Sequence, residues 1–176
     1  MNNLKNNLLL DITTVITLVS DLCLDPNIAN RFGDIKEWQI RNKLVYEQII
    51  DEMENPVYHK LMTKIKNKKL CITESTLDKI KEIIDNLGSN DEKLNLKKFL
   101  KNTLIIEDDP HEIFKNFQGK NWNSFNKNIF GTAYKHDMII VTGNINILNA
   151  LINEFKLDVK YIAHRSRCFI GKKYEK

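Results

Sequence analysis

Short apolar runs alternate with longer amphipathic segments from one end of the chain to the other. The apolar runs cover residues 8–10, 70–73, 103–106, 138–142 and 159–162. They are short and rich in Leu, Ile and Val, which predicts β-strands. Between them, apolar positions recur every three or four residues, as on a helix with one buried face. The predicted helices cover residues 13–24, 35–53, 58–66, 76–87, 92–100, 111–117, 129–135 and 145–155.

Alternation of single strands with helices is typical of a three-layer α/β/α fold whose central sheet is mostly parallel. No internal repeat, Gly-Ser linker or low-complexity tail divides the 176 residues. The sequence therefore predicts one α/β domain spanning residues 1–176. A chain of this length can bury a sizeable hydrophobic core.

Composition indicates the cellular compartment of the protein better than its function. A net charge of +4 is compatible with polyanionic partners but does not require them. The three cysteines are far apart and form no CxxC pair, which argues against a disulfide framework or zinc ribbon. The apolar stretch 8–24 is interrupted by Asp11 and Asp21 and is too short and polar to span a bilayer. We therefore expect a cytoplasmic or nuclear protein without a membrane partner.

Polar residues follow the first and fourth predicted strands directly. Asp11 comes after the first strand, and Thr142 and Asn144 come at the end of the fourth. Ligand sites in parallel sheets form outside the carboxyl ends of the strands, so these side chains are candidates for one site. The alternative is that Asp11 caps the following helix and that Thr142 and Asn144 serve as turn and capping residues.

The order of these motifs resembles a PIN domain, a small α/β nuclease-like fold. Asp11-Ile12-Thr13-Thr14 matches the opening strand, acid and hydroxyl-bearing turn of that fold. Asp78 matches a second acid early in the helix after strand two. Thr142 matches the Thr after the closing strand, but Asn144 stands where PIN domains carry a further acid.

A closer resemblance is to an uncharacterised eukaryotic family whose C-terminal domain is PIN-like. The matching segments are Leu10-Asp11-Ile12-Thr13-Thr14-Val15-Ile16, Ile83-Ile84-Asp85-Asn86-Leu87-Gly88, Ile129-Phe130-Gly131-Thr132, Val141-Thr142-Gly143-Asn144 and Ala163-His164-Arg165-Ser166-Arg167. Together they span most of the chain. The chain departs from that family at Ala133-Tyr134, where the family has Gly-Asp.

The resemblance implies a ribonuclease that depends on Mg²⁺ or Mn²⁺. Carboxylates in such a site hold the metal ions, which activate water and neutralise charge on the phosphate. By this analogy Asp11 and Asp78 would hold the metal, and Thr13 or Thr142 would orient water or phosphate. Together with Asn144, these residues form the predicted catalytic site.

Two of the four acids expected from the PIN pattern are replaced in this chain, by Asn126 and Asn144. Fewer negative charges attract a hard divalent ion less strongly. Other acids that a shift in register would bring in are Glu47, Glu74 and Asp137. The alternative hypothesis is therefore a catalytically inactive PIN-like module that binds nucleic acid or protein, in which Asp78 is a solvated helix carboxylate.

Basic and aromatic residues are interleaved near the C-terminus. They are Lys160, Tyr161, His164, Arg165, Arg167, Phe169, Lys172, Lys173 and Tyr174. Basic side chains can follow a phosphate backbone while aromatic rings stack on bases. We therefore predict that Thr13, His164, Arg165 and Arg167 contact RNA, the alternative being a solvated tail. The acidic runs 51–54 and 107–109 are interpreted as solvated surface.

Overall fold

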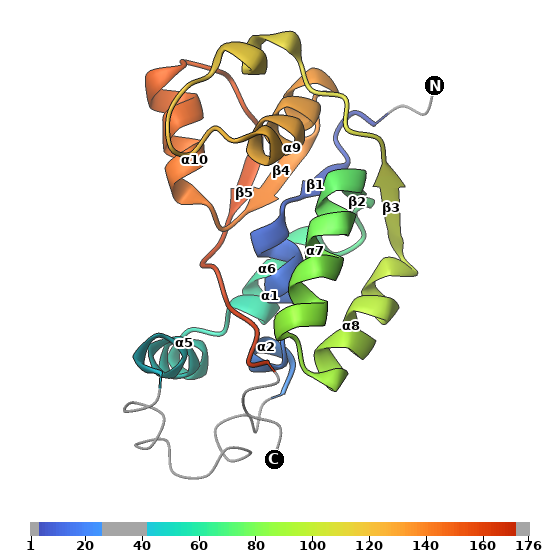
Figure 1. Cartoon of the computed structure of the whole chain (residues 1–176), viewed down its shortest axis with the longest axis vertical. Coiled ribbons are helices and arrows are strands. Elements are labelled where there is room, and N and C mark those ends of the chain that lie inside the picture. The colour runs from blue at the N-terminus through green and yellow to red at the C-terminus, as the bar shows by residue number, and fades with distance from the viewer. Residues whose placement is uncertain (1–3, 26–41, 172–176) are drawn as a thin grey trace.

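Five parallel strands form the central sheet in a computed structural model that describes residues 4–25 and 42–171 (Figure 1). The order across the sheet is β3-β2-β1-β4-β5. The strands are β1 (Leu8–Leu10), β2 (Leu70–Thr73), β3 (Thr103–Ile106), β4 (Ile139–Thr142) and β5 (Tyr161–Ala163). All four neighbouring pairs run parallel, which confirms the predicted sheet.

Helices connect the strands. The α-helices are α1 (Ile12–Val19), α2 (Asp21–Leu24), α5 (Lys43–Glu54), α6 (Val57–Ile65), α7 (Glu74–Leu87), α8 (Asn90–Leu100), α9 (Ser124–Lys135) and α10 (Ile145–Asn149). A 3₁₀ segment, η1 (Glu112–Asn116), precedes α9, and a π-helical segment, η2 (Ala150–Glu154), continues α10.

Alternating side chains of the strands build one hydrophobic core on each face of the sheet. Leu8 and Leu10 of β1 pack with residues of α1, α6, α7 and α8, whereas Leu9 packs with residues of η1, α9, α10 and η2. Figure 1 shows the two groups of helices on opposite sides of the strands. Since successive strand residues point to opposite faces, three adjacent leucines serve both cores. The predicted three-layer α/β/α class is thus confirmed.

Most predicted elements are present, and the differences arise at helix ends. The helix predicted for 13–24 is divided at Ser20, whose side chain accepts a hydrogen bond from Leu22 N at 3.2 Å and caps α2. The helix predicted for 129–135 begins earlier, because Asn123 caps α9 by accepting from Asn126 N at 2.9 Å. The helix predicted for 35–53 is seen as α5, and its part before residue 42 lies outside the described residues.

The three thiols of Cys23, Cys71 and Cys168 are free, in agreement with the expectation from their spacing. No helix within residues 4–25 and 42–171 has the length and apolar character needed to cross a membrane.

The strand order places the carboxyl ends of β1 and β4 side by side. From β1 the chain proceeds to β2 and β3 on one side, whereas β4 and β5 extend the sheet on the other. Leu10 of β1 pairs with Val141 of β4. Such a reversal of strand order is a topological switch point, where open α/β sheets bind ligands. Asp11 and Thr142 therefore lie where α/β folds of this kind commonly bind ligands.

Candidate functional site

The Asp11 carboxylate lies at the centre of the switch point and is 3% exposed. Its Oδ1 accepts hydrogen bonds from Thr13 Oγ1 at 2.7 Å and from Thr14 N at 2.9 Å. Thr14 Oγ1 lies 3.0 Å from the same oxygen, but its single proton is shared with the Val141 carbonyl at 2.7 Å. Its Oδ2 accepts a short hydrogen bond from Thr142 Oγ1. Asp11 is thus the N-cap of α1, as the alternative interpretation of this residue proposed.

Burial raises the pKa of Asp11, because it penalises the charged form. Hydrogen bonds from Thr142, Thr13 and Thr14 oppose this effect by stabilising the carboxylate. Three donors engage its oxygens and the Thr14 hydroxyl lies beside them, so few of its lone pairs are left for a metal ion.

The loop after β4 is hydrogen-bonded to the threonines that contact Asp11. Thr13 Oγ1 accepts from Gly143 N at 2.7 Å, and Thr142 Oγ1 accepts from Asn144 N at 2.9 Å. Asn144 Oδ1 accepts from Ile147 N at 3.4 Å and caps α10, so the capping alternative also holds for Asn144. These hydrogen bonds join the carboxyl ends of β1 and β4.

Gly143 lets the segment after β5 approach this edge closely. A Cβ added at Gly143 would lie 2.3 Å from Ser166 Oγ and 3.2 Å from His164 Cε1. Ser166 Oγ in turn donates to the Gly143 carbonyl at 3.1 Å. Residues 164–166 therefore lie against the switch point rather than forming a solvated tail.

His164 extends the network away from the sheet. Its Nδ1 lies 2.8 Å from the Arg165 carbonyl, which can only accept, so Nδ1 carries a proton. Its Nε2 lies 2.8 Å from Thr14 Oγ1. Burial lowers the pKa of His164, and the positive charges of Arg167 and Lys64 act in the same direction. The charge of Asp11 opposes them.

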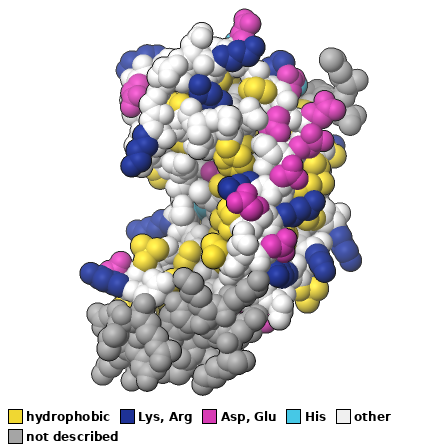
Figure 2. Space-filling model, in the orientation of Figure 1, with side chains coloured by type: hydrophobic (Ala, Val, Ile, Leu, Met, Phe, Trp, Pro, Cys, Tyr) yellow, Lys and Arg dark blue, Asp and Glu magenta, His cyan; other side chains and the backbone are white. Residues whose placement is uncertain are grey.

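Asp78, the second predicted metal ligand, lies apart from this network on the exposed surface of α7. Figure 2 shows acidic side chains spread along the face that α7 presents to solvent. Within the described parts of the chain, no hydrogen bond or ion pair joins Asp78 to Asp11. Nor do three His, Cys, Asp or Glu side chains gather there in an arrangement that could hold a metal ion.

The other acids considered for the metal site have different environments. Glu74 is exposed in the first turn of α7, and Glu47 lies 3.7 Å from Lys43 on α5. Asp137 pairs with Lys160 at 2.6 Å. Asn126 lies in the first turn of α9, where its amide donates to the Asn121 carbonyl at 2.7 Å. Among the described residues, no hydrogen bond or ion pair joins these side chains to Asp11.

Arg165 and Arg167, both predicted to contact RNA, are held by carboxylates of α5. Arg167 Nε donates to Glu52 Oε2 at 2.7 Å, and Arg167 Nη2 lies 2.8 Å from Asp51 Oδ2 without the angle of a hydrogen bond. Only 3% of the Arg167 side chain is exposed, so it is an interior group that a bound strand does not reach. Arg165 also pairs with Asp51 but is 65% exposed.

Glu52, the acid of α5 that pairs with Arg167, was expected to be solvated but lies in the interior. Glu52 is buried, and it also accepts from Val57 N at 2.8 Å, which stabilises the first turn of α6. The prediction of a solvated acidic face is therefore wrong for Glu52. The remaining predicted basic and aromatic residues, Lys172, Lys173 and Tyr174, lie outside the described residues.

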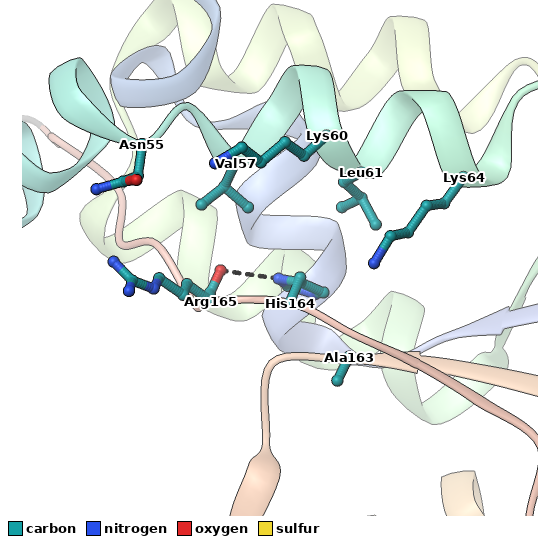
Figure 3. A pocket seen from close by; sticks show the side chains of 8 residues that line it. All are labelled: Asn55, Val57, Lys60, Leu61, Lys64, Ala163, His164 and Arg165. Carbon is teal, nitrogen blue, oxygen red and sulfur yellow. Dashed lines mark hydrogen bonds between the residues drawn. The ribbon is translucent and has the colours of Figure 1, made fainter.

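A pocket of about 190 Å³ opens beside His164, between α6 and the segment after β5 (Figure 3). Its lining residues are Asn55, Val57, Lys60, Leu61, Lys64, Ala163, His164 and Arg165. Figure 3 shows Lys64 pointing from α6 toward His164 and Ala163. Every ionisable group of the lining is basic. We call this site the basic pocket.

Lys60 and Lys64 are not among the site residues predicted from the sequence. Their spacing of four residues places them on one side of a helix, which is visible in the sequence. The placement of α6 beside residues 163–165 depends on the order of the strands and on the pairing of α5 with Arg167. The spacing of apolar residues in the sequence reveals neither of these.

Residues 8–176 match a family described as "Protein of unknown function (DUF1308)". The match covers Asp11, Thr13, Thr14, Thr142 and His164, and every residue that lines the basic pocket.

Proposed function

The chain belongs to this DUF1308 family, and from the chemistry of its switch-point edge we propose that it is a PIN-like module that binds RNA without cleaving it. The observation that carries the proposal is the basic pocket, which lies at the edge of the sheet where α/β folds bind ligands. Lys60, Lys64 and Arg165 supply positive charge there, and phosphate groups are the polyanion that such charge attracts.

The state of Asp11 supports binding over hydrolysis. A two-metal or one-metal nuclease site needs carboxylate oxygens that are free to coordinate the ion. The Asp11 oxygens are instead engaged by Thr13, Thr14 and Thr142. Asn144, at the position of a further PIN acid, is engaged in capping α10.

The second candidate is a metal-dependent ribonuclease, and one observation favours it. Asp11 is a buried acid with a raised pKa at the switch point, a position where catalytic carboxylates occur. Binding of Mg²⁺ or Mn²⁺ would have to replace some of its present hydrogen bonds and recruit Asp78 or another acid.

The two candidates are separated by following one labelled RNA in two ways. A single-stranded RNA with phosphate at both ends is titrated with protein, and binding is measured by fluorescence anisotropy. The same samples, with Mg²⁺ or Mn²⁺ added, are then examined on a denaturing gel. We expect saturable binding and intact RNA. Metal-dependent fragments that disappear in both Asp11→Asn and Asp78→Asn would instead establish the nuclease.

A further inference from the structure

We propose that the basic pocket binds a terminal phosphate monoester of a nucleic-acid strand. The pocket is lined by Lys60, Lys64, His164 and Arg165. This inference names the part of the strand that the switch-point edge recognises, and it rests on the proposed RNA-binding function.

The charge around the pocket matches a monoester better than a diester. Arg165 shares Asp51 with Arg167, so its charge is partly compensated. Lys60 and Lys64 have no carboxylate partner among the residues that the structure describes. The pocket therefore presents two uncompensated ammonium groups. A phosphate monoester carries a charge of about −1.5 to −2 near pH 7, whereas a backbone diester carries about −1.

The donors of the pocket also suit a group with three free oxygens. The ammonium groups of Lys60 and Lys64 can each donate up to three hydrogen bonds, and the Arg165 guanidinium offers several more. They come from two directions, α6 on one side and the segment after β5 on the other (Figure 3). A monoester has three terminal oxygens to receive them. A diester within a strand has only two free oxygens.

The size of the pocket points to one group rather than a whole nucleotide. Its volume of about 190 Å³ lies below the range of roughly 300–1,000 Å³ typical of sites that enclose entire small molecules. Val57, Leu61 and Ala163 contribute apolar surface to its walls. Apolar walls lower the local dielectric and strengthen the attraction between the ammonium groups and the phosphate.

The inference is tested with three single-stranded RNA 10-mers of one sequence, which carry a 5′-phosphate, a 3′-phosphate or no terminal phosphate. Their affinities are measured by anisotropy for the wild type and for Lys60→Gln/Lys64→Gln. The matched control is Lys97→Gln/Lys101→Gln, which removes two exposed lysines at the same spacing from the end of α8. A nucleoside monophosphate serves as competitor in each titration.

We expect the wild type to bind at least one phosphorylated 10-mer about tenfold more tightly than the unphosphorylated one. Lys60→Gln/Lys64→Gln should lose this preference, and Lys97→Gln/Lys101→Gln should keep it. Equal affinity of the wild type for all three 10-mers would overturn the monoester inference while leaving RNA binding intact. Absence of binding to any of them would overturn both. A monophosphate that competes as well as the 10-mer would overturn the assignment to a strand.

Discussion

Asp11 connects α1, β1 and β4 through three hydrogen bonds to a single buried carboxylate. An N-cap contributes about 1 kcal/mol, and each further buried hydrogen bond about 1 kcal/mol. We therefore expect Asp11→Ala to lower the free energy of unfolding by about 3 kcal/mol. Urea denaturation followed by circular dichroism measures this loss.

The matched control for this change is Asp78→Ala, which removes a carboxylate from the exposed surface of α7. Exposed substitutions of this kind usually alter stability by less than about 0.5 kcal/mol. Similar losses for the two variants would show that Asp11 does not hold the edge of the sheet together.

His164 makes stability depend on pH in a defined direction. Its pKa in the folded protein lies below the ordinary value of 6.5, chiefly because the ring is buried. Between the lowered pKa and 6.5, the unfolded chain binds more protons than the folded one. The contribution of His164 to the free energy of unfolding therefore falls as pH decreases. The wild type should therefore lose stability relative to His164→Gln below pH 6.5.

Urea titrations of the wild type and His164→Gln from pH 5 to pH 8 measure this difference. The groups that act on the ring are Asp11, Lys64, Arg165 and Arg167. A difference that stays constant over this range, or grows in favour of the wild type on acidification, would show that burial does not lower the pKa of His164.

At the scale of elements, Glu92 joins three segments that are far apart in sequence. It is fully buried and completes a capping box with Ser89 at the start of α8. Its carboxylate also accepts from Asp21 N at 3.2 Å, from Ile170 N at 2.9 Å and from Gly171 N at 3.3 Å. Glu92 thus holds the segment after β5 against α2 and α8, together with Ser20, whose Oγ donates to the Cys168 carbonyl at 2.7 Å.

Glu92→Gln tests this connection with almost no change in size. The amide offers one oxygen instead of two, and its NH₂ group would face backbone N–H donors that need acceptors. We expect a loss of about 3 kcal/mol in the free energy of unfolding. Hydrogen exchange should also become faster at the amides of Ile170 and Gly171.

The control for this variant is Glu82→Gln, which affects an exposed ion pair with Lys79. Surface pairs of this kind contribute about 0–1 kcal/mol. Unchanged exchange at Ile170 in Glu92→Gln would mean that other contacts hold the segment after β5.

The sequence predicted elements well where local patterns decide them. Each of the five strands falls on a predicted apolar run, because buried parallel strands need continuous apolar residues. The start of α9 was missed because its N-cap, Asn123, lies among other polar residues that look like a loop. Glu52 and Glu92 were missed as buried groups, since burial of a carboxylate depends on partners from distant segments.

At the scale of the whole molecule, the order of the strands decides which residues meet. The sequence predicted that Asp11 and Thr142 would share one edge, and Thr142 donates to Asp11. It placed Asp78 in the same site by resemblance, but Asp78 lies on the solvent side of α7. Lys60 and Lys64 reach the edge because α6 packs beside residues 163–165, which no local pattern encodes.

Binding of RNA phosphate at the basic pocket should make affinity depend on salt concentration. For single strands, log K falls with log salt by about 0.7 per phosphate neutralised. The measurement is the anisotropy-derived affinity of an RNA with phosphate at both ends, from low to high salt. It is made for the wild type, Lys60→Gln/Lys64→Gln and Lys97→Gln/Lys101→Gln.

We predict that Lys60→Gln/Lys64→Gln makes the slope less steep by about 1.4, the value for two lost lysine contacts at about 0.7 each, and that the control leaves it unchanged. An unchanged slope in Lys60→Gln/Lys64→Gln, or an equal change in Lys97→Gln/Lys101→Gln, would contradict RNA binding at the basic pocket.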